Sequence, residues 1–262
     1  MAHIIAHPGG RFRLPLLDMG RRLLSRAGGD CPLCGARVAG ARLCPGCQAD
    51  ILAAPSGAGA RCPRCALRLQ AGGSACAACL ARPRAFCRTV AAFDYAPPAD
   101  TLILMLKTQM RLSMAPVLAR LMAEVLMADV LRADVLRAEG AHALSPPGLL
   151  LVPVPASRAS LRQRGMNPAA EIARSLAVEL ALPPPRHLLT RRRDTPRQAT
   201  LDRRARQQGT AGLFVCPHPL PGRHVAVVDD VMTTGSTADA AAAALRAAGA
   251  ASVTVLVAAR TP

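Results

Sequence analysis

The sequence predicts an α/β fold in which a mostly parallel sheet with flanking helices follows a small cysteine-rich module. Two observations support this: short apolar runs alternate with helical segments from residue 149 onward, and four Cys-x-x-Cys pairs precede residue 80. With 262 residues, 51% of them hydrophobic, the chain can bury a sizeable core. We expect a helical lead-in at 1–28, the cysteine module at 29–85 and the α/β domain at 86–262.

The eight paired cysteines predict metal binding. Two thiolates separated by two residues can grip one ion, and two such pairs complete a tetrahedral zinc site with four sulfur ligands. Cysteines of a cytoplasmic chain stay reduced, so their spacing is interpreted as metal binding before disulfides. We predict two structural zinc ions and a tandem double zinc ribbon, with these ligands: Cys31, Cys34, Cys44, Cys47, Cys62, Cys65, Cys76 and Cys79.

The Cys-x-x-Cys pairs could in principle serve redox chemistry or a catalytic zinc ion instead. A redox Cys-x-x-Cys would open a helix in a βαβ unit, and no such pattern lies nearby. A catalytic zinc would need an open coordination position, whereas four sulfurs fill the site. The pairs could also share ions in a crossed arrangement. The two remaining cysteines, Cys87 and Cys216, are expected to be ordinary small buried residues.

The charge of the chain favours an anionic partner. The formal net charge is +17, and Lys107 is the sole lysine among 33 basic side chains, a bias that GC-rich coding can also produce. Residues 51–92 hold six arginines and no acid, which could lie along a phosphate backbone or merely solvate a module with little core. Neither a secretory signal nor an apolar run of about 20 residues is present, so we expect a cytoplasmic protein without membrane insertion.

The elements follow from periodicity and from capping residues. A strand is expected at 86–95, and helices at 99–110 and 115–140 follow it. Asn167 before Pro168 is typical of an N-cap followed by proline in the first helical turn. The remaining elements are expected to be strands at 149–155, 224–230 and 252–258 and helices at 167–181 and 236–250.

A polar constellation follows the apolar run at 224–228. Asp229 and Asp230 end this strand, and two carboxylates there are costly unless a ligand donates hydrogen bonds or positive charge. The next residues supply hydroxyls, a glycine for close backbone approach and a helix N-terminus, which together form a phosphate cradle. Its members are Thr233, Thr234, Gly235, Ser236 and Thr237. The other interpretation is a turn that the acids and threonines cap themselves.

The stretch VVDDVMTTGST resembles the phosphoribosyl pyrophosphate (PRPP) signature of type I phosphoribosyltransferases. Nearly the whole chain resembles the ComF family, whose pattern combines a double zinc ribbon with a type I phosphoribosyltransferase-like domain. The matching positions after the ribbon are Lys107, Val152–Pro155, Arg164, Gly165, Asn167, Thr195, Gln198, Arg206 and Phe214. The chain departs from the family at Gly209, where asparagine is usual, and in having RGMNP for RGFNQ.

The resemblance implies a role for each position. Asp229 and Asp230 would hold ribose and Mg²⁺, and the loop from Thr233 to Thr237 would hold the 5-phosphate. Lys107 and Arg164 would serve the same site, and residues 190–206 would form a lid or a solvated basic loop. The pyrophosphate would meet the backbone after what we take as the first parallel strand, at Val154, Pro155, Ala156 and Ser157.

Three functions are compatible with this pattern. The first is a phosphoribosyltransferase that transfers the phosphoribosyl group of PRPP to an unknown acceptor and releases pyrophosphate. The second, implied by the resemblance, is a nucleic-acid module in DNA uptake and natural transformation, with single-stranded DNA and a competence helicase as candidate partners. The third is a regulator that binds PRPP without reacting.

Overall fold

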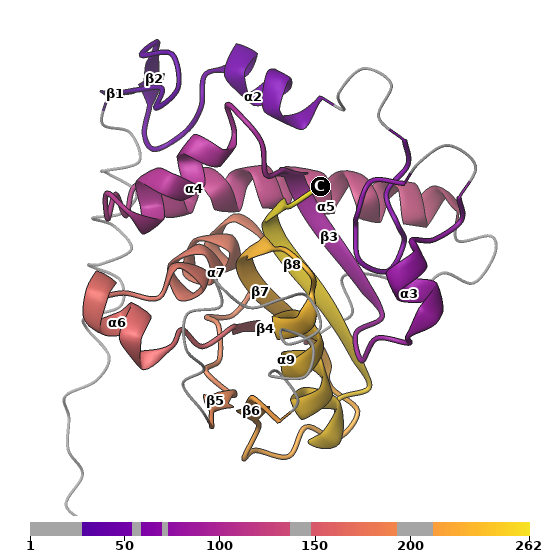
Figure 1. Ribbon diagram of the computed structural model, residues 1–262. Helices are drawn as coiled ribbons and strands as arrows, with labels where there is room; N and C mark the ends of the chain where they lie inside the picture. The colour runs from indigo at the N-terminus through magenta and orange to yellow at the C-terminus, as the bar shows by residue number, and fades with distance from the viewer. Residues whose placement is uncertain (1–27, 54–58, 70–72, 137–147, 193–211) are drawn as a thin grey trace, which may run out of the picture.

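The computed structural model describes residues 28–53, 59–69, 73–136, 148–192 and 212–262, and all but the last residue of the predicted lead-in at 1–28 lies outside them. A four-stranded sheet of order β3-β8-β7-β4 forms its centre, and all three strand pairings are parallel (Figure 1). The α/β fold predicted from the sequence is therefore confirmed. The sheet strands are β3 (Arg88–Asp94), β4 (Leu150–Pro153), β7 (His224–Met232) and β8 (Ser252–Arg260).

Helices cover both faces of the sheet. Along β7, Ala226 and Val228 pack into a core shared with α5 and α7, while Val225 and Val227 pack into a second core shared with α9. Because successive strand residues point to opposite faces, burial of both faces explains the uninterrupted apolar run. The helices around the sheet are α4 (Asp100–Lys107), α5 (Met114–Leu136), α6 (Arg158–Arg164), α7 (Pro168–Glu179) and α9 (Ser236–Ala247).

The connections make the carboxyl ends of β4 and β7 the place where a ligand crevice is expected. The chain leaves β4 for α7, which covers one face, and leaves β7 for α9, which covers the other. Where neighbouring parallel strands send their helices to opposite faces, the loops beyond their carboxyl ends diverge and ligands bind between them. The loops that meet there begin at Val154 and Thr233. Since β3 precedes β4 and is parallel, β4 is the second parallel strand along the chain, not the first.

The cysteine module is a structural duplication. In the first half, Cys31 N donates to Ala36 O at 2.8 Å, and in the second, Cys62 N donates to Leu67 O at 2.7 Å. The turns also match: Gly35 has φ +75° and Ala66, in the same place, has φ +57°. The first half comprises β1 (Gly28–Asp30), β2 (Arg37–Ala39) and α2 (Pro45–Leu52); the second comprises an Arg61–Arg68 bridge and α3 (Ala77–Ala81).

The two halves pack on opposite layers of the sheet. Cys31 and Ile51 belong to the core that contains α5, whereas Cys62 and Phe86 belong to the core that contains α9. In Figure 1, β1, β2 and α2 accordingly lie at one side of α5, and α3 lies beside β3. Each half thus shares its core with the sheet, so that the metal sites are tied to the fold.

Most predicted elements are confirmed, although several end elsewhere than expected: β8 extends to Arg260, α4 ends at Lys107 and α9 ends at Ala247. The strand at 224–230 extends to Met232, and β4 ends at Pro153 although we expected it to reach residue 155. The prediction for the unpaired cysteines is wrong, because Cys87 is exposed and Cys216 is half-buried. Within the described part of the chain, every helix is too short or too polar to cross a bilayer.

Candidate functional site

The acid pair lies where β4 stops pairing with β7. Val228 is the last β7 residue opposite β4, facing Pro153, and Asp229 and Asp230 come next. Two backbone groups donate to the carboxylates: Asp230 N to Asp229 Oδ1 at 2.9 Å, and Val231 N to Asp230 Oδ1 at 2.7 Å. The acids therefore stand in the crevice between the two diverging loops, as the sequence predicted.

Lys107 meets the pair from another element. Lys107 is the last residue of α4, and the buried residues of α4 belong to the core that contains α5 and α7. Lys107 Nζ lies 2.9 Å from Asp230 Oδ1, and the carboxylate side chain is only 10% exposed. One positive charge therefore faces two neighbouring acids.

The negative charge of Asp229 is only partly compensated by the groups around it. Burial raises the pKa of Asp229, and the negative charge of Asp230 raises it further, while Lys107, the Asp230 N–H and Arg191 lower it. The pKa of Asp229 is raised overall, from 3.8 to about 7. The site therefore stores a negative charge that a bound cation would stabilise.

This pKa predicts a stability change for Asp229→Asn. Because the folded-state pKa lies above the unfolded value, the carboxyl's contribution is fully present below about pH 4 and is lost as pH rises through 7. Asparagine carries no such charge and still offers an oxygen to Asp230 N. At pH 8 we expect the variant to be more stable than the wild type by about 1–3 kcal/mol, allowing for partial solvent screening.

Thermal unfolding at pH 5 and pH 8 measures this effect. The difference in melting temperature between Asp229→Asn and the wild type should widen at pH 8, whereas the exposed Asp50→Asn control should show no such trend. An equal difference at both pH values would contradict the raised pKa of Asp229.

The hydroxyl loop prepares the N-terminus of α9. Thr234 Oγ1 lies 2.9 Å from Ser236 Oγ, and Ser236 N donates to Thr234 Oγ1 at 3.4 Å. Gly235 is the N-cap residue and has φ +76°, a conformation that favours glycine. Gly235 makes no side-chain capping bond, so the N–H groups of α9 that follow Ser236 can serve a ligand. Thr233 is exposed and Thr237 is half-buried.

The loop after β4 is held from two sides. Asn167 caps α7 through Ala169 N and donates from Nδ2 to Val154 O at 2.9 Å. From β5 (Thr190–Arg191), Arg191 Nη1 donates to Pro155 O at 3.2 Å, and Arg191 also packs over Phe214 of β6 (Phe214–Val215). Ser157 caps α6 by accepting from Ser160 N. The asparagine of the RGxN motif thus positions the backbone of the loop after β4.

Not every predicted residue is joined to this site. Arg164 ends α6 and is half-buried, but none of the described contacts links it to the acid pair. Thr195, Gln198, Arg206 and Gly209 lie outside the described residues, as does most of the segment 190–206. Ala156 follows the tethered Pro155 in the same loop.

Sequence reasoning missed a buried arginine that joins the site to the second cysteine cluster. Arg260 is 5% exposed, and its Nε donates to Cys65 O at 3.0 Å. Its Nη1 donates to Met232 O at 3.2 Å, directly before the hydroxyl loop, and to Thr261 O. The available signal was a cation that ends an apolar strand, the same pattern that singled out Asp229.

We expect Arg260→Met to destabilise the protein by about 1–3 kcal/mol, because Cys65 O loses its donor, while Met232 O keeps the two that Thr261 provides. Chemical denaturation measures this loss. Arg223→Met is the matched control, since Arg223 donates to Gly148 O at the exposed surface and should cost far less. Equal stability of the two variants would show that Arg260 does not tie the loop down.

The cysteines form two compact clusters. The first contains the sulfurs of residues 31, 34, 44 and 47 and the second those of 62, 65, 76 and 79, all within 4.8 Å of one another in each cluster. Neighbouring sulfurs lie 3.5 Å apart at Cys34–Cys44 and 3.4 Å at Cys65–Cys76. Tetrahedral zinc with Zn–S bonds of about 2.3 Å requires about 3.8 Å between sulfurs. Both clusters could hold zinc, and successive pairs share a site rather than crossed ones.

The turns favour a thiolate in each cluster. Burial raises the pKa of Cys31, but backbone N–H groups outweigh it and bring the pKa to about 6. Cys62 behaves alike: burial raises its pKa and backbone donors lower it to about 6. Amide donors to sulfur stabilise the ligand form that zinc binds.

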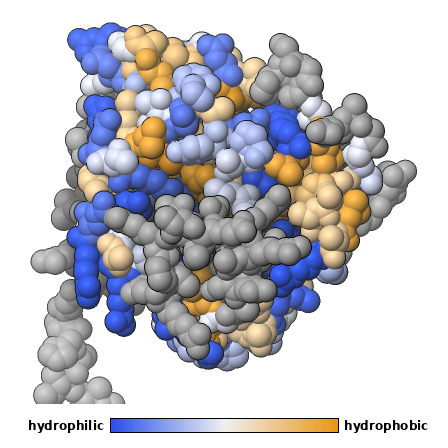
Figure 2. Space-filling model, viewed as in Figure 1, coloured by the Kyte–Doolittle hydropathy of each residue, from blue (hydrophilic) through white to orange (hydrophobic). Residues whose placement is uncertain are grey.

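The arginines of residues 51–92 do not form a continuous positively charged surface along which a phosphate backbone could lie. Around α3, the surface gathers hydrophobic residues instead (Figure 2), and Leu80 there is 69% exposed. Arg82 is the one of the six arginines without a partner among the described residues. The other five bind within the chain: Arg61 and Arg68 to Asp94, Arg64 to Phe86 O, Arg84 to Asp239 and Arg88 to Asp129.

Comparison with known proteins finds relatives of the same name in two bacteria. The chain is 35% identical over 199 residues to the DNA utilization protein YhgH of Escherichia coli K12, covering 74% of this chain and 81% of the relative. It is 34% identical over 198 residues to the protein of that name in Salmonella typhimurium.

It is also 31% identical over 210 residues to Competence protein F of Haemophilus influenzae, covering 79% of this chain and 85% of the relative. No protein-family profile matches the chain. Identities of this level over most of both chains, together with the sheet, the acid-pair loop and the two four-cysteine clusters, show that this protein belongs to the ComF family.

Proposed function

We propose that this protein binds PRPP with Mg²⁺ at the crevice between β4 and β7 and acts in DNA uptake and natural transformation. One observation carries the proposal: two adjacent carboxylates face a single lysine, and the pKa of Asp229 is raised to about 7. A structural cap would not retain a charge at such cost. A ligand that brings a cation and hydroxyl donors accounts for it.

The donor set fits a hard cation. Asp229 and Asp230 offer only oxygens at the open end of the sheet, and Mg²⁺ prefers carboxylates together with ligand phosphates. When bound, Mg²⁺ would neutralise the pyrophosphate charge. Ribose hydroxyls would donate to the remaining carboxylate oxygens, and Lys107, freed in part from Asp230, would reach a phosphate oxygen.

The remaining groups fit the other ends of PRPP. The α9 N-terminus with Ser236 and Thr237 would hold the 5-phosphate. The backbone from Val154 to Ser157, which Asn167 and Arg191 fix, would hold the pyrophosphate. With an acceptor present, pyrophosphate would leave from a ribose carbon that gains oxocarbenium character, and catalysis would be positional and electrostatic. This is the chemistry of a phosphoribosyltransferase, with an acceptor still to be identified.

A second candidate is a non-catalytic protein that uses the same pocket to bind nucleic acid or to sense PRPP. The relatives favour it, because the names DNA utilization protein and Competence protein F describe a biological role and not a reaction. Single-stranded DNA, a competence helicase and a cytoplasmic setting belong to both versions of the proposal.

Thermal unfolding and pyrophosphate release test the proposal together. PRPP should raise the melting temperature only when Mg²⁺ is present. At a PRPP concentration a hundred-fold above Kd, the free energy of unfolding should increase by about 3 kcal/mol. Ribose 5-phosphate, which lacks the pyrophosphate, should protect less. Pyrophosphate release in an acceptor screen would establish the enzyme, and protection without release would establish the sensor. No protection by PRPP with Mg²⁺ would refute both.

A further inference from the structure

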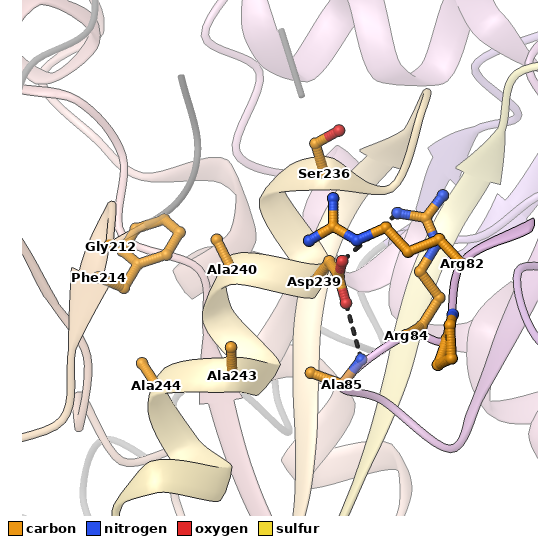
Figure 3. Close-up of a pocket in the computed structure, with 11 residues that line it drawn as sticks. Arg82, Arg84, Ala85, Gly212, Phe214, Ser236, Asp239, Ala240, Ala243 and Ala244 are labelled. Carbon is orange, nitrogen blue, oxygen red and sulfur yellow. Dashed lines mark hydrogen bonds and ion pairs between the residues drawn. The ribbon is translucent and has the colours of Figure 1, made fainter. Parts of the chain in front are cut away.

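A cavity of about 420 Å³ lies on the α9 side of the hydroxyl loop. Its walls come from three places: the segment after α3 with Arg82 and Arg84, the first turns of α9 and the residues around Phe214 (Figure 3). It shares Ser236 with the hydroxyl loop but contains neither acid of the pair. Its size falls in the range of small-molecule sites.

One wall of the cavity is cationic. The Arg84 side chain is 7% exposed, yet its buried Nε has no hydrogen-bond partner in the described structure. Its Nη1 lies 3.5 Å from Asp239 Oδ2 and its Nη2 donates to Thr234 O at 3.3 Å, both long contacts. The two terminal nitrogens, whose present contacts are long, are the atoms with which this guanidinium can bind a ligand in the cavity.

Arg82 adds a second positive charge. It is exposed, has no partner among the described residues, and lines the same cavity. Asp239 supplies one negative charge and also accepts from Ala85 N at 2.8 Å. The cavity therefore keeps an excess positive charge, which suits a phosphate group.

The opposite wall is apolar and flat. Ala240, Ala243 and Ala244 project from one side of α9, with Ala243 exposed, and Figure 3 shows them between Phe214 and the two arginines. Small side chains leave room for a planar ring to lie against the helix. A phosphate at one end and a flat ring at the other describe a nucleotide.

We propose that this cavity is a nucleotide subsite, separate from the ribose-phosphate crevice. Arg82 and Arg84 hold the phosphate, and the base lies against the alanines of α9. The nucleotide is either free or part of a single strand, and the second source rests on the DNA role of the proposed function. Because Arg84 also binds Thr234 O, an occupant contacts the hydroxyl loop through this residue.

Two variants and a control test the subsite. Arg82→Ala removes the unpartnered cation, and Ala243→Leu fills the flat wall with a good helix former at an exposed position. Arg42→Ala is the matched control, an exposed arginine in the first cysteine module that removes the same charge far from the cavity. The probes are thymidine 5′-monophosphate, followed by calorimetry, and a short labelled oligothymidylate, followed by fluorescence anisotropy.

We expect Arg82→Ala and Ala243→Leu each to weaken binding about ten-fold, and Arg42→Ala by less than about two-fold. Arg82→Ala should also lower the slope of log affinity against log salt for the oligonucleotide by about 0.7. If the variants lose affinity for both probes, a free nucleotide is sufficient to occupy the subsite. If the variants lose affinity for the oligonucleotide, and the monophosphate does not bind even to the wild type, the ligand is a single strand.

The proposal is overturned if the wild type binds neither probe, if Arg82→Ala behaves as Arg42→Ala, or if Ala243→Leu binds as the wild type. Protection of Arg82→Ala by PRPP with Mg²⁺ is measured in parallel and should match that of the wild type. Failure of the nucleotide subsite is thereby distinguished from failure of the PRPP site.

Discussion

Removing metal from the second cysteine cluster is expected to unfold the α9 side of the protein. Cys62, Cys65 and Cys76 are buried in the same core as β7, β8 and α9, and Arg260 joins Cys65 O to Met232 O. Structural zinc contributes about 10–16 kcal/mol of apparent binding free energy in small domains. Without it, four thiols, three of them buried, lose their common partner and this core loses one wall.

The measurement compares Cys65→Ser in the second cluster with Cys34→Ser in the first, with metal content determined for each. We expect two zinc ions per wild-type chain. Cys65→Ser should lower the melting temperature by about 10 °C or more and abolish protection by PRPP, while Cys34→Ser, exposed at the edge of the first cluster, should cost less. Cys87→Ser, an exposed cysteine outside both clusters, is the control. A metal-free chain with unchanged melting would contradict the structural role of the clusters.

Neutralising the acid pair is expected to abolish PRPP binding without unfolding the protein. In Asp229→Asn/Asp230→Asn, both charges that would face Mg²⁺ are gone, and the amide oxygens are weaker ligands for a hard cation. We expect at least a hundred-fold loss of affinity. Asp229→Asn alone is expected to be more stable than the wild type at pH 8, whereas Asp230→Asn removes the ion pair with Lys107, so folding of the double variant is measured directly.

Equilibrium binding of PRPP with Mg²⁺ measures this loss, with circular dichroism to verify the fold. Asp50→Asn, which removes an exposed carboxylate, should bind as the wild type does. Retained affinity in the double variant would mean that the pair serves the fold and not a ligand.

Local patterns predicted this part of the site well. Residues 224–237 carry a strand, an acid pair, a hydroxyl–glycine loop and a helix in consecutive positions, so their geometry depends on neighbours in the chain. The alternating pattern also predicted a parallel sheet, and the cysteine spacing predicted two four-sulfur clusters. The contacts within the loop and within each cysteine cluster are close in sequence, whereas the parallel sheet, which pairs distant strands such as β3 and β8, followed from the alternation of strands and helices.

The contacts that the sequence could not predict are those between distant segments. Arg260 and Cys65 are 195 positions apart, and Arg84 and Asp239 are 155 apart. In a chain with 33 basic side chains, nothing distinguishes a buried arginine from a solvated one. The pairing of cysteine pairs and the packing of the two halves on opposite layers likewise depend on tertiary structure.

Calorimetric titration of PRPP into the zinc-loaded protein tests the central claim most directly. We predict a saturable heat with one site per chain when Mg²⁺ is present, and little or none when Mg²⁺ is replaced by a chelator that spares zinc. The absence of binding with Mg²⁺ to a folded protein, or equal binding with and without it, would contradict the assignment of Asp229 and Asp230 to a ribose-phosphate site.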